Sequence, residues 1–233
     1  MIKLCSDFPD FYMRDAAFMH ILCLKAAFSD SALEEDMWVQ MEDEEICSVI
    51  ARQGGRIYIS SRGGNTDELK DFINTIGFAE IFTESSTAER LGLVTENGFT
   101  VLLKNSVKES VFSPLDIGIA PLYEGLRLGE DSDISLPAFE DFAADISHRL
   151  RHGAAVAVSD DRGAALAFVC EKGGIINGIS VKKELRGKGF GSLMLQRLLS
   201  FCEGDILACT SQNNIDFYIK NGFDKVGTAV IAR

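Results

Sequence analysis

The alternation of apolar and polar positions predicts a mixed α/β fold over the C-terminal half of the chain. Residues 136–151 carry apolar side chains at helical spacing, and two β-like runs, 154–159 and 164–170, flank the hairpin sequence Asp160-Asp161-Arg162-Gly163. Gly173-Gly174 predicts a second turn. The elements expected after it are a strand over 175–181, a helix over 190–203, a strand over 205–209, a helix over 213–221 and a strand over 224–231. The helix over 190–203 is amphipathic and is expected to bury Leu193, Met194, Leu198, Leu199 and Phe201.

The same pattern occurs once before in the chain. MEDEEICSVIARQGG (41–55) resembles SDDRGAALAFVCEKGG (159–174), and IYIS (57–60) matches NGIS (177–180). Further on, residues 72–84 resemble 198–210, and residues 96–104 resemble 220–232. Chance likeness between two generic α/β units is the alternative explanation. We interpret the pattern as two copies of one unit.

The two copies differ in one connection. The second has a longer, basic and glycine-rich segment between its Gly-Gly strand and the next helix, where the first has only residues 61–65. The polar and turn-rich stretch 105–115 separates the copies. We therefore predict an α/β (α+β) fold with a mostly antiparallel sheet flanked by helices. It is divided into a domain over 1–110, which lacks the glycine-rich segment, and a domain over 111–233, which retains it.

Composition narrows the class of protein. The chain has 233 residues, 46% hydrophobic and 25% charged, which is typical of globular domains rather than disordered or fibrous chains. No apolar run is long enough to span a bilayer, and the first ten residues lack the basic start of a secretory signal. We expect a cytoplasmic protein. The six cysteines and three histidines are scattered, so no metal site or disulfide framework is expected.

The net charge of −12 argues against nucleic acid as a partner. Most of the negative charge lies in residues 1–105, where the acidic run Glu42-Asp43-Glu44-Glu45 is expected to be a solvated turn. By contrast, residues 182–188 (KKELRGK) are locally basic. This basic island precedes a predicted helix, whose first N–H groups and positive dipole end favour an anion. A phosphate or diphosphate is therefore the expected ligand.

The glycine pattern excludes two common nucleotide sites. It is neither GxxxxGK[ST], as in P-loop proteins, nor GxGxxG within a βαβ unit, as in Rossmann folds. Taken alone, the cluster could equally be a plain turn. Its sequence, Val181-x-x-x-x-Arg186-Gly187-Lys188-Gly189-Phe190-Gly191, resembles the acyl-CoA signature of the GNAT superfamily of N-acetyltransferases, and Phe217-Tyr218-Ile219-Lys220-Asn221-Gly222-Phe223 resembles that family's second signature.

The resemblance covers about 120–233 well, extends weakly to 1–105 through the repeat, and implies acetyl-CoA as acyl donor and an amine as acceptor. It implies that the strand edge at Ile179, Ser180 and Val181 hydrogen-bonds the pantetheine arm, and that Tyr218 protonates the leaving thiolate. A buried packing aromatic is the alternative role for Tyr218. The diphosphate would be held by backbone N–H groups of Arg186, Gly187, Lys188, Gly189, Phe190, Gly191 and Ser192.

The sequence departs from the family pattern at three places. Lys183 stands where the family often has Pro, which we expect to be harmless. Ser211 stands where the family often has Asn, and we expect Asn214, or Asn213, to replace it in holding pantetheine. The first copy has Val94 where Tyr218 aligns and lacks the loop, so we predict that residues 1–105 do not bind CoA.

The general base is left unassigned. No carboxylate lies on the strand 175–181; Glu171 and Asp160 are the nearest candidates, each more consistent with a solvated hairpin. Cys170 and Cys209 have no histidine beside them in sequence that would indicate a nucleophile. The leading prediction is therefore an acetyl-CoA-dependent N-acetyltransferase. The alternatives are a catalytically silent CoA-binding regulatory or scaffold protein and a binder of an unrelated phosphate ester. The acceptor and the oligomeric state are not predicted; we place acceptor specificity in the loops around 121–136 and at the interface with the first half.

Overall fold

The computed structural model describes residues 1–5, 11–28, 36–107, 118–128 and 136–233. The chain forms two compact units. The first contains Met1–Val101 and Val226–Arg233, and the second contains Leu102–Lys225. The predicted boundary at 110/111 lies outside the described residues, so the division into domains 1–110 and 111–233 stays a prediction.

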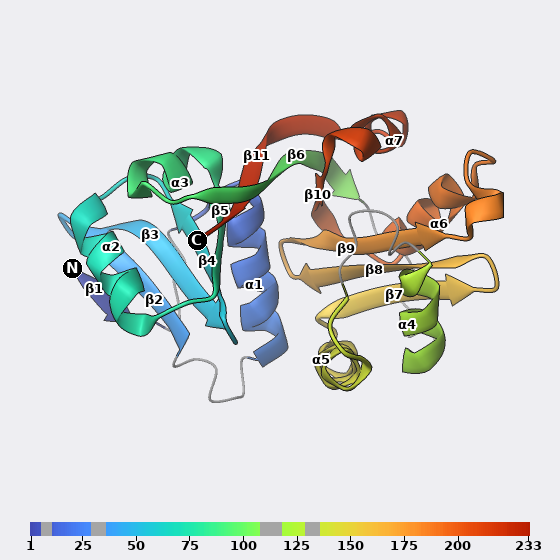
Figure 1. Cartoon of the computed structure of the whole chain (residues 1–233), viewed down its shortest axis with the longest axis horizontal. Coiled ribbons are helices and arrows are strands. Elements are labelled where there is room, and N and C mark those ends of the chain that lie inside the picture. Colours follow the sequence, from blue (N-terminus) through green and yellow to red (C-terminus); the bar gives the residue numbers. More distant parts are fainter. Residues whose placement is uncertain (6–10, 29–35, 108–117, 129–135) are drawn as a thin grey trace. The chain divides into compact units, whose positions relative to one another are not determined.

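The first unit is an α/β layer structure with the strand order β1-β2-β3-β4-β5-β11-β6 (Figure 1). Strands β2, β3 and β4 form an antiparallel meander, and β4 and β5 are parallel. The elements are β1 (Ile2–Leu4), α1 (Ala16–Phe28), β2 (Met37–Glu42), β3 (Glu45–Gln53), β4 (Arg56–Ser61), α2 (Thr66–Ile76), β5 (Glu80–Glu84), α3 (Ser85–Leu91) and β6 (Thr95–Val107).

The second unit repeats this architecture. Strands β7, β8 and β9 form an antiparallel meander, and β9 and β10 are parallel, in the strand order β7-β8-β9-β10-β6. The elements are α4 (Ile119–Arg127), α5 (Phe139–Arg151), β7 (Ala155–Asp160), β8 (Gly163–Cys170), β9 (Gly173–Val181), the short 3-10 helix η2 (Lys183–Leu185), α6 (Phe190–Leu199), β10 (Gly204–Thr210), the 3-10 helix η3 (Gln212–Asn214), α7 (Ile215–Lys220) and β11 (Asp224–Ala232).

The predicted duplication is confirmed by the order of elements. The series β2-β3-β4-α2-β5-α3-β6 has its counterpart in β7-β8-β9-α6-β10-α7-β11. One feature was not expected: the last strand of each copy contributes to both units. Residues 226–232 of β11 lie in the first unit, where Ala229–Ala232 pair antiparallel with Ile81–Glu84 of β5. Residues 102–107 of β6 belong to the second unit. Propensity assigns a strand but does not choose its partner, so the sequence could not predict this exchange.

The core of the second unit lies between its sheet and the helices α6 and α7. Met194, Leu195 and Leu198 of α6 pack on apolar residues of β8, β9 and β10. The helix ends at Leu199, earlier than the predicted 203, and Leu193 is 41% exposed instead of buried. The other face of the sheet carries α4, since a methyl group built on Gly125 of α4 would lie 2.7 Å from Cβ of Ala164.

The predicted turn at Gly173-Gly174 is wrong. Both glycines are the first residues of β9, and the turn lies at residues 171–172. The reason is close packing of strands: a Cβ on Gly173 would lie 2.0 Å from the carbonyl oxygen of Asp205, and one on Gly174 would lie 2.5 Å from that of Phe168. These glycines permit backbone approach rather than reversal of the chain.

Candidate functional site

Strands β9 and β10 separate before β9 ends. Their parallel pairing runs from Gly173–Asp205 to Ile176–Ala208, and no later pair occurs within the described residues. On its other side β9 stays paired with β8 as far as Val181–Gly163, with a register shift between Leu166 and Ala167. The edge of β9 that carries Ile179, Ser180 and Val181 is therefore outside the β9–β10 ladder. Such an edge can pair with an extended ligand as an added strand would.

The predicted strand, glycine loop and helix follow one another as expected. After β9 and η2, Gly187 and Gly189 have φ values of 75° and 86°, a left-handed conformation that favours glycine. Gly189 is the N-cap of α6 and supplies no side-chain cap, and the first helical N–H bonded back to the loop is that of Leu193, to the Gly189 carbonyl. The N–H groups of Phe190, Gly191 and Ser192 thus stand at the uncapped, positive end of the helix dipole.

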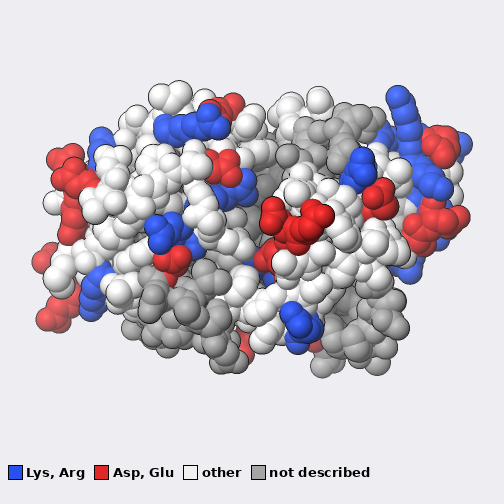
Figure 2. Space-filling view, turned by 60° about the horizontal axis from the view of Figure 1, so that its bottom comes forward, with Lys and Arg blue, Asp and Glu red and all other residues white. Residues whose placement is uncertain are grey.

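Basic side chains outnumber acidic ones in the segment 182–189 before this helix. The first turn of α6 contains no acidic residue, and the exposed side chains of Lys183 and Lys188 belong to the loop before it. Figure 2 shows basic side chains gathered at the end of the second unit that carries α6, interleaved with acidic ones. The arrangement suits an anion of high charge density, such as a diphosphate.

The Arg186 side chain has a structural role that the sequence did not predict. Its Nε donates to the Val181 carbonyl oxygen at 3.2 Å, and its Nη2 donates to the Leu128 carbonyl oxygen at 2.7 Å. Arg186 therefore joins the end of β9 to the C-terminal end of α4, where a cation also complements the helix dipole. No sequence signal marked Leu128, because its contribution is a backbone oxygen. The backbone N–H of Arg186 donates to the Lys183 carbonyl oxygen at 3.3 Å, and that of Lys188 donates to the Leu185 carbonyl oxygen at 3.4 Å. These two N–H groups, which were expected to hold a diphosphate, therefore have partners within the loop.

The helix start packs closely on α7. A methyl group on Gly191 would lie 3.2 Å from Cε2 of Phe217, so this glycine lets α6 approach the second signature segment. Ser192 Oγ accepts a hydrogen bond from Nδ2 of Asn221 at 3.1 Å, and the same Nδ2 donates to the Phe217 carbonyl at 2.7 Å. The link from Asn221 to Ser192 is a feature that the sequence did not reveal. Asn214 is the N-cap residue of α7, at the end of η3.

Tyr218 lies in the core of the second unit. Its ring is 8% exposed and contacts the rings of Phe217 and Phe223 edge-on, with centroids 5.1 and 5.4 Å apart. Tyr218 therefore has the packing role that the sequence analysis gave as its alternative. The ring lies on the same helix, α7, that approaches Gly191, which brings the two signature segments together in one unit.

The two carboxylates considered as bases occupy different environments. Asp160 accepts hydrogen bonds from Arg162 Nη2 at 2.6 Å and from Arg197 Nη1 at 3.0 Å. The Arg162 side-chain hydrogen bond is the largest cause that lowers the pKa of Asp160 below its ordinary value. A lowered pKa makes Asp160 a weaker base, which argues against a role in deprotonating an amine. Glu171 is exposed in the β8–β9 turn.

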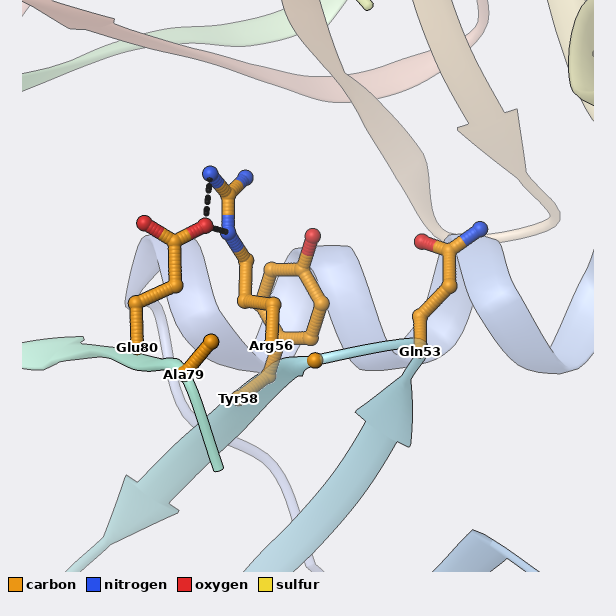
Figure 3. A pocket seen from close by; sticks show the side chains of 6 residues that line it. Gln53, Arg56, Tyr58, Ala79 and Glu80 are labelled. Atoms are coloured by element: carbon orange, nitrogen blue, oxygen red, sulfur yellow. Dashed lines mark hydrogen bonds and ion pairs between the residues drawn. The ribbon is translucent and has the colours of Figure 1, made fainter. Parts of the chain in front are cut away.

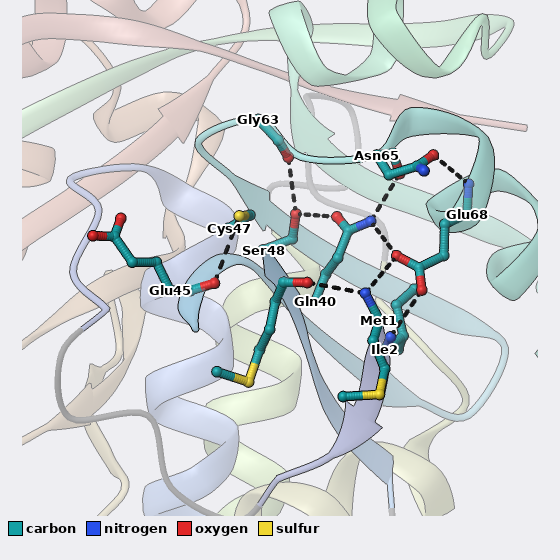
Figure 4. Close-up of polar contacts among 10 residues, drawn as sticks. Met1, Ile2, Gln40, Glu45, Cys47, Ser48, Gly63, Asn65 and Glu68 are labelled. Atoms are coloured by element: carbon teal, nitrogen blue, oxygen red, sulfur yellow. Dashed lines mark hydrogen bonds and ion pairs between the residues drawn. The ribbon is translucent and has the colours of Figure 1, made fainter. Parts of the chain in front are cut away.

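The corresponding junction in the first unit is filled by the protein itself (Figure 4). Asn65 caps α2 through a hydrogen bond from the Glu68 N–H to its Oδ1 at 3.0 Å. The Glu68 carboxylate lies in the first turn and accepts from Gln40 Nε2 at 3.0 Å and from the N–H of Ile2 at 3.1 Å. Ser48 Oγ bonds to both Gln40 Oε1 and Ser61 Oγ. A bound anion would here face a carboxylate and an already capped helix.

The first unit also has a shallow hollow at the opposite end of β4 (Figure 3). Its volume is about 270 Å³. Arg56 Nε donates to Glu80 Oε1 at 2.6 Å across it, so the cation and the carboxylate largely neutralise each other. The other lining residues are Gln53, Gly55, Tyr58 and Ala79. Because α2 starts beyond the other end of β4, this hollow is distinct from the filled junction.

A family model described as an acetyltransferase (GNAT) domain matches residues 151–225. The chain contains a GNAT acetyltransferase domain. The matched region includes the strand edge of β9, the glycine loop, α6 and α7, so the resemblance given by the two signature segments is confirmed. Among the described residues, no helix combines the length and apolar character that a bilayer crossing requires.

Solved structures share the fold over most of the chain. A GCN5-related N-acetyltransferase from Kribbella flavida is 11% identical, with a TM-score of 0.58, over 91% of this chain and 95% of that one. A GCN5-related N-acetyltransferase from Sphaerobacter thermophilus is 15% identical, with a TM-score of 0.54, over 93% and 90%. A tandem GNAT protein of the clavulanic acid biosynthesis pathway is 12% identical, with a TM-score of 0.47, over 84% and 81%. No curated protein matches the sequence.

The likenesses to the Kribbella flavida and Sphaerobacter thermophilus structures establish the fold class. The chain has the acyl-CoA N-acyltransferase fold, with a mostly antiparallel sheet flanked by helices and the order of elements repeated in tandem. The domain belongs to a family of acyltransferases.

Proposed function

We propose that the second unit binds acetyl-CoA and transfers its acetyl group to an amine. The observation that carries this proposal is the uncapped start of α6, with glycines at positions 187 and 189 in a left-handed conformation and no acid in the first turn. It lies beside a strand edge outside the β9–β10 ladder. A diphosphate and an extended amide-containing arm, joined in one molecule, suit these two features together.

Each group of residues has its own role in the proposed reaction. The N–H groups of residues 190–192 and those of Gly187 and Gly189 bind the diphosphate, while the side chains of Lys183 and Lys188 add positive charge. The edge at Ile179–Val181 orients the pantetheine arm, with Asn214 as a further partner. Acetyl-CoA, when bound, supplies an activated thioester. The amine nitrogen attacks the thioester carbon, the C–N bond forms and the C–S bond breaks, and the Tyr218 hydroxyl protonates the departing sulfur. The amine proton leaves to water, and the Tyr218 phenolate takes a proton back from water.

Two measurements test the proposal. Acetyl-CoA at about 100 times its dissociation constant should stabilise the folded chain by about 2.7 kcal/mol, and ATP, which also carries phosphates, should not. Release of free CoA thiol in the presence of a panel of primary amines should then report turnover. Tyr218→Phe keeps the ring in the core and should lower kcat by about 10²-fold with acetyl-CoA binding retained. Stabilisation by ATP but not by acetyl-CoA would instead favour an unrelated phosphate ester as ligand.

A CoA-binding regulatory or scaffold protein is the second candidate. The packing of Tyr218 between Phe217 and Phe223, and the low pKa of Asp160, favour it. Binding of acetyl-CoA without thiol release for any amine, with Tyr218→Phe indistinguishable from the parent protein, would decide for this function.

A further inference from the structure

The repeat places two serines in equivalent strand positions. Ser60 ends the segment IYIS of β4, and Ser180 ends the matching segment NGIS of β9. Both side chains are buried, with 1% and 3% of the residue exposed. A buried hydroxyl needs a hydrogen-bond partner, because leaving it without one costs stability. The two serines therefore form an internal comparison.

The hydroxyl of Ser60 has such a partner within the fold. It donates to Oδ2 of Asp15 at 2.5 Å, and Oδ1 of Asp15 accepts from the N–H of Phe18 at 2.7 Å. Asp15 thereby links the start of α1 to β4. The role of Ser60 is structural.

The hydroxyl of Ser180 has none. Its Oγ is buried and has no hydrogen-bond partner among the described residues. Ser180 also lies beyond Ile176, the last residue of β9 paired with β10. The repeat has thus kept the hydroxyl at the point where the strands separate, without the internal acid that satisfies it in the first unit.

Pairing across the sheet fixes which face Ser180 occupies. Ser180 pairs with Ala164 of β8, and directly opposed residues of antiparallel strands project to the same face. Ala164 approaches Gly125, so this is the α4 face. The neighbouring Val181 points the other way, since a Cβ on Gly191 of α6 would lie 3.9 Å from its Cγ2. The strand thus directs Val181 toward the diphosphate-binding helix and Ser180 away from it.

We infer that Ser180 is an acceptor-binding residue, whose hydroxyl oxygen takes a hydrogen bond from an N–H of the attacking amine. This inference rests on the proposed acetyl transfer. Helix α6 covers one face of β9, and Ser180 lies on the other face, the one that packs on α4, at the point where β9 and β10 have separated. A hydroxyl is neutral and removes no proton itself; it orients the amine so that the nitrogen lone pair points at the thioester carbon. The acceptor is accordingly a primary or secondary amine.

The test compares Ser180→Ala with Ser60→Ala in the full-length chain. Initial rates are measured with the primary amine of the panel that gives the fastest thiol release, varying the amine at saturating acetyl-CoA and then the reverse. Ser180→Ala should lower kcat/KM for the amine about ten-fold and leave the KM for acetyl-CoA unchanged. Its Tm should stay the same or rise, because the variant removes a buried hydroxyl that has no partner in the fold. Ser60→Ala should lower Tm by about 4 °C and leave both substrates' kinetic constants unchanged.

A second variant keeps the result interpretable if the first misfolds. Ser180→Cys retains the size of the side chain and a weak acceptor, so it should fall between the parent and Ser180→Ala in kcat/KM for the amine. Unchanged amine kinetics in Ser180→Ala, or an effect confined to the KM for acetyl-CoA, would overturn the assignment while leaving acetyl transfer intact. If the parent protein transfers acetyl to no amine, the proposed function fails and this inference fails with it.

Discussion

The starts of α2 and α6 occupy the same place in the two copies and have opposite character. In the first unit the helix is capped by Asn65, its first turn holds Asp67 and Glu68, and Gln40 bridges the cap to the carboxylate. In the second unit the helix begins at a glycine with no side-chain cap and no acid. The connection before it is longer, 182–189 against 62–65. One helix start is satisfied by the protein, and the other is the proposed diphosphate site.

The two copies differ at this helix start while the sheet is unchanged. The meander and the parallel pair are the same in both copies. What changes is whether the orphan N–H groups at a helix start have partners inside the fold. The prediction that residues 1–105 do not bind CoA thereby gains a physical basis in Asn65 and Glu68.

The largest expected effect comes from copying the first unit's acid into the second. Ser192 and Glu68 are each the third residue of their helix. Ser192→Glu places a carboxylate beside the proposed diphosphate site, and like charges brought together cost several kcal/mol. We expect acetyl-CoA affinity to fall at least about 30-fold, or about 2 kcal/mol, as measured by calorimetric titration. Folding stability should hold or rise slightly, because an acid favours a helix N-terminus.

Ser192→Gln is the matched control for charge. It has nearly the shape of the glutamate variant without its charge, so most of the affinity should remain. Equal losses in the two variants would mean that size, or the contact of Ser192 with Asn221, dominates and that no anion binds at this helix start.

The second prediction separates structure from binding within the loop. Arg186→Gln removes two charge-assisted hydrogen bonds to the carbonyls of Val181 and Leu128, which at a partly exposed site should cost about 1–2 kcal/mol of unfolding free energy. Lys188→Gln, in the same loop and exposed, should leave stability unchanged and weaken acetyl-CoA binding about three-fold through lost charge. Urea unfolding and ligand titration of both variants check the pair. If Lys188→Gln were the less stable of the two, the role given to Arg186 would be wrong.

The sequence predicted the elements of the second unit well because their signals are local. The hairpin around Asp161 and Arg162, the strand before the loop and the start of α6 follow from turn residues and periodicity within a few positions. The glycine-rich loop was recognisable for the same reason: its backbone conformation needs glycine at positions 187 and 189.

The features that the sequence missed depend on long-range partners. Ala229–Ala232 pair with β5, and Arg186 bonds to the Leu128 carbonyl, so both contacts join residues that are distant in sequence. That the Ser180 hydroxyl lacks a partner has no local sequence signal either. The turn expected at Gly173-Gly174 failed for a related reason. Gly173 and Gly174 serve close contact with Asp205 and Phe168, and sequence alone does not tell that use from a turn.

The third prediction tests whether the filled junction of the first unit is structural. Glu68→Gln weakens the bonds from Gln40 and Ile2, and should cost about 1 kcal/mol of unfolding free energy near neutral pH. The hydrogen bond from Gln40 is the largest cause that lowers the pKa of Glu68, so the parent protein should lose this advantage as the pH falls below about 4.5 and the carboxyl takes up its proton. Acetyl-CoA stoichiometry should stay at one per chain, because Asn65 still caps α2. A second binding site in this variant would contradict the account.

The smallest effect concerns the acid that satisfies Ser60. Burial is the largest cause acting on Asp15 and raises its pKa above the ordinary 3.8, despite the hydrogen bond from Ser60. The folded chain therefore holds this proton more tightly than the unfolded chain, so stability is lost as the pH rises from about 3.8 through the folded pKa. Asp15→Asn keeps an oxygen acceptor and removes the charge, so its stability should decline less than that of the parent over this rise in pH, in urea unfolding series from pH 4 to 7.

The second unit has no such acid at Ser180 among the described residues, and Ser180→Ala should leave the parent's pH profile unchanged. Identical profiles for the parent and Asp15→Asn would show that the carboxyl titrates normally and that the two serines differ less than their contacts indicate.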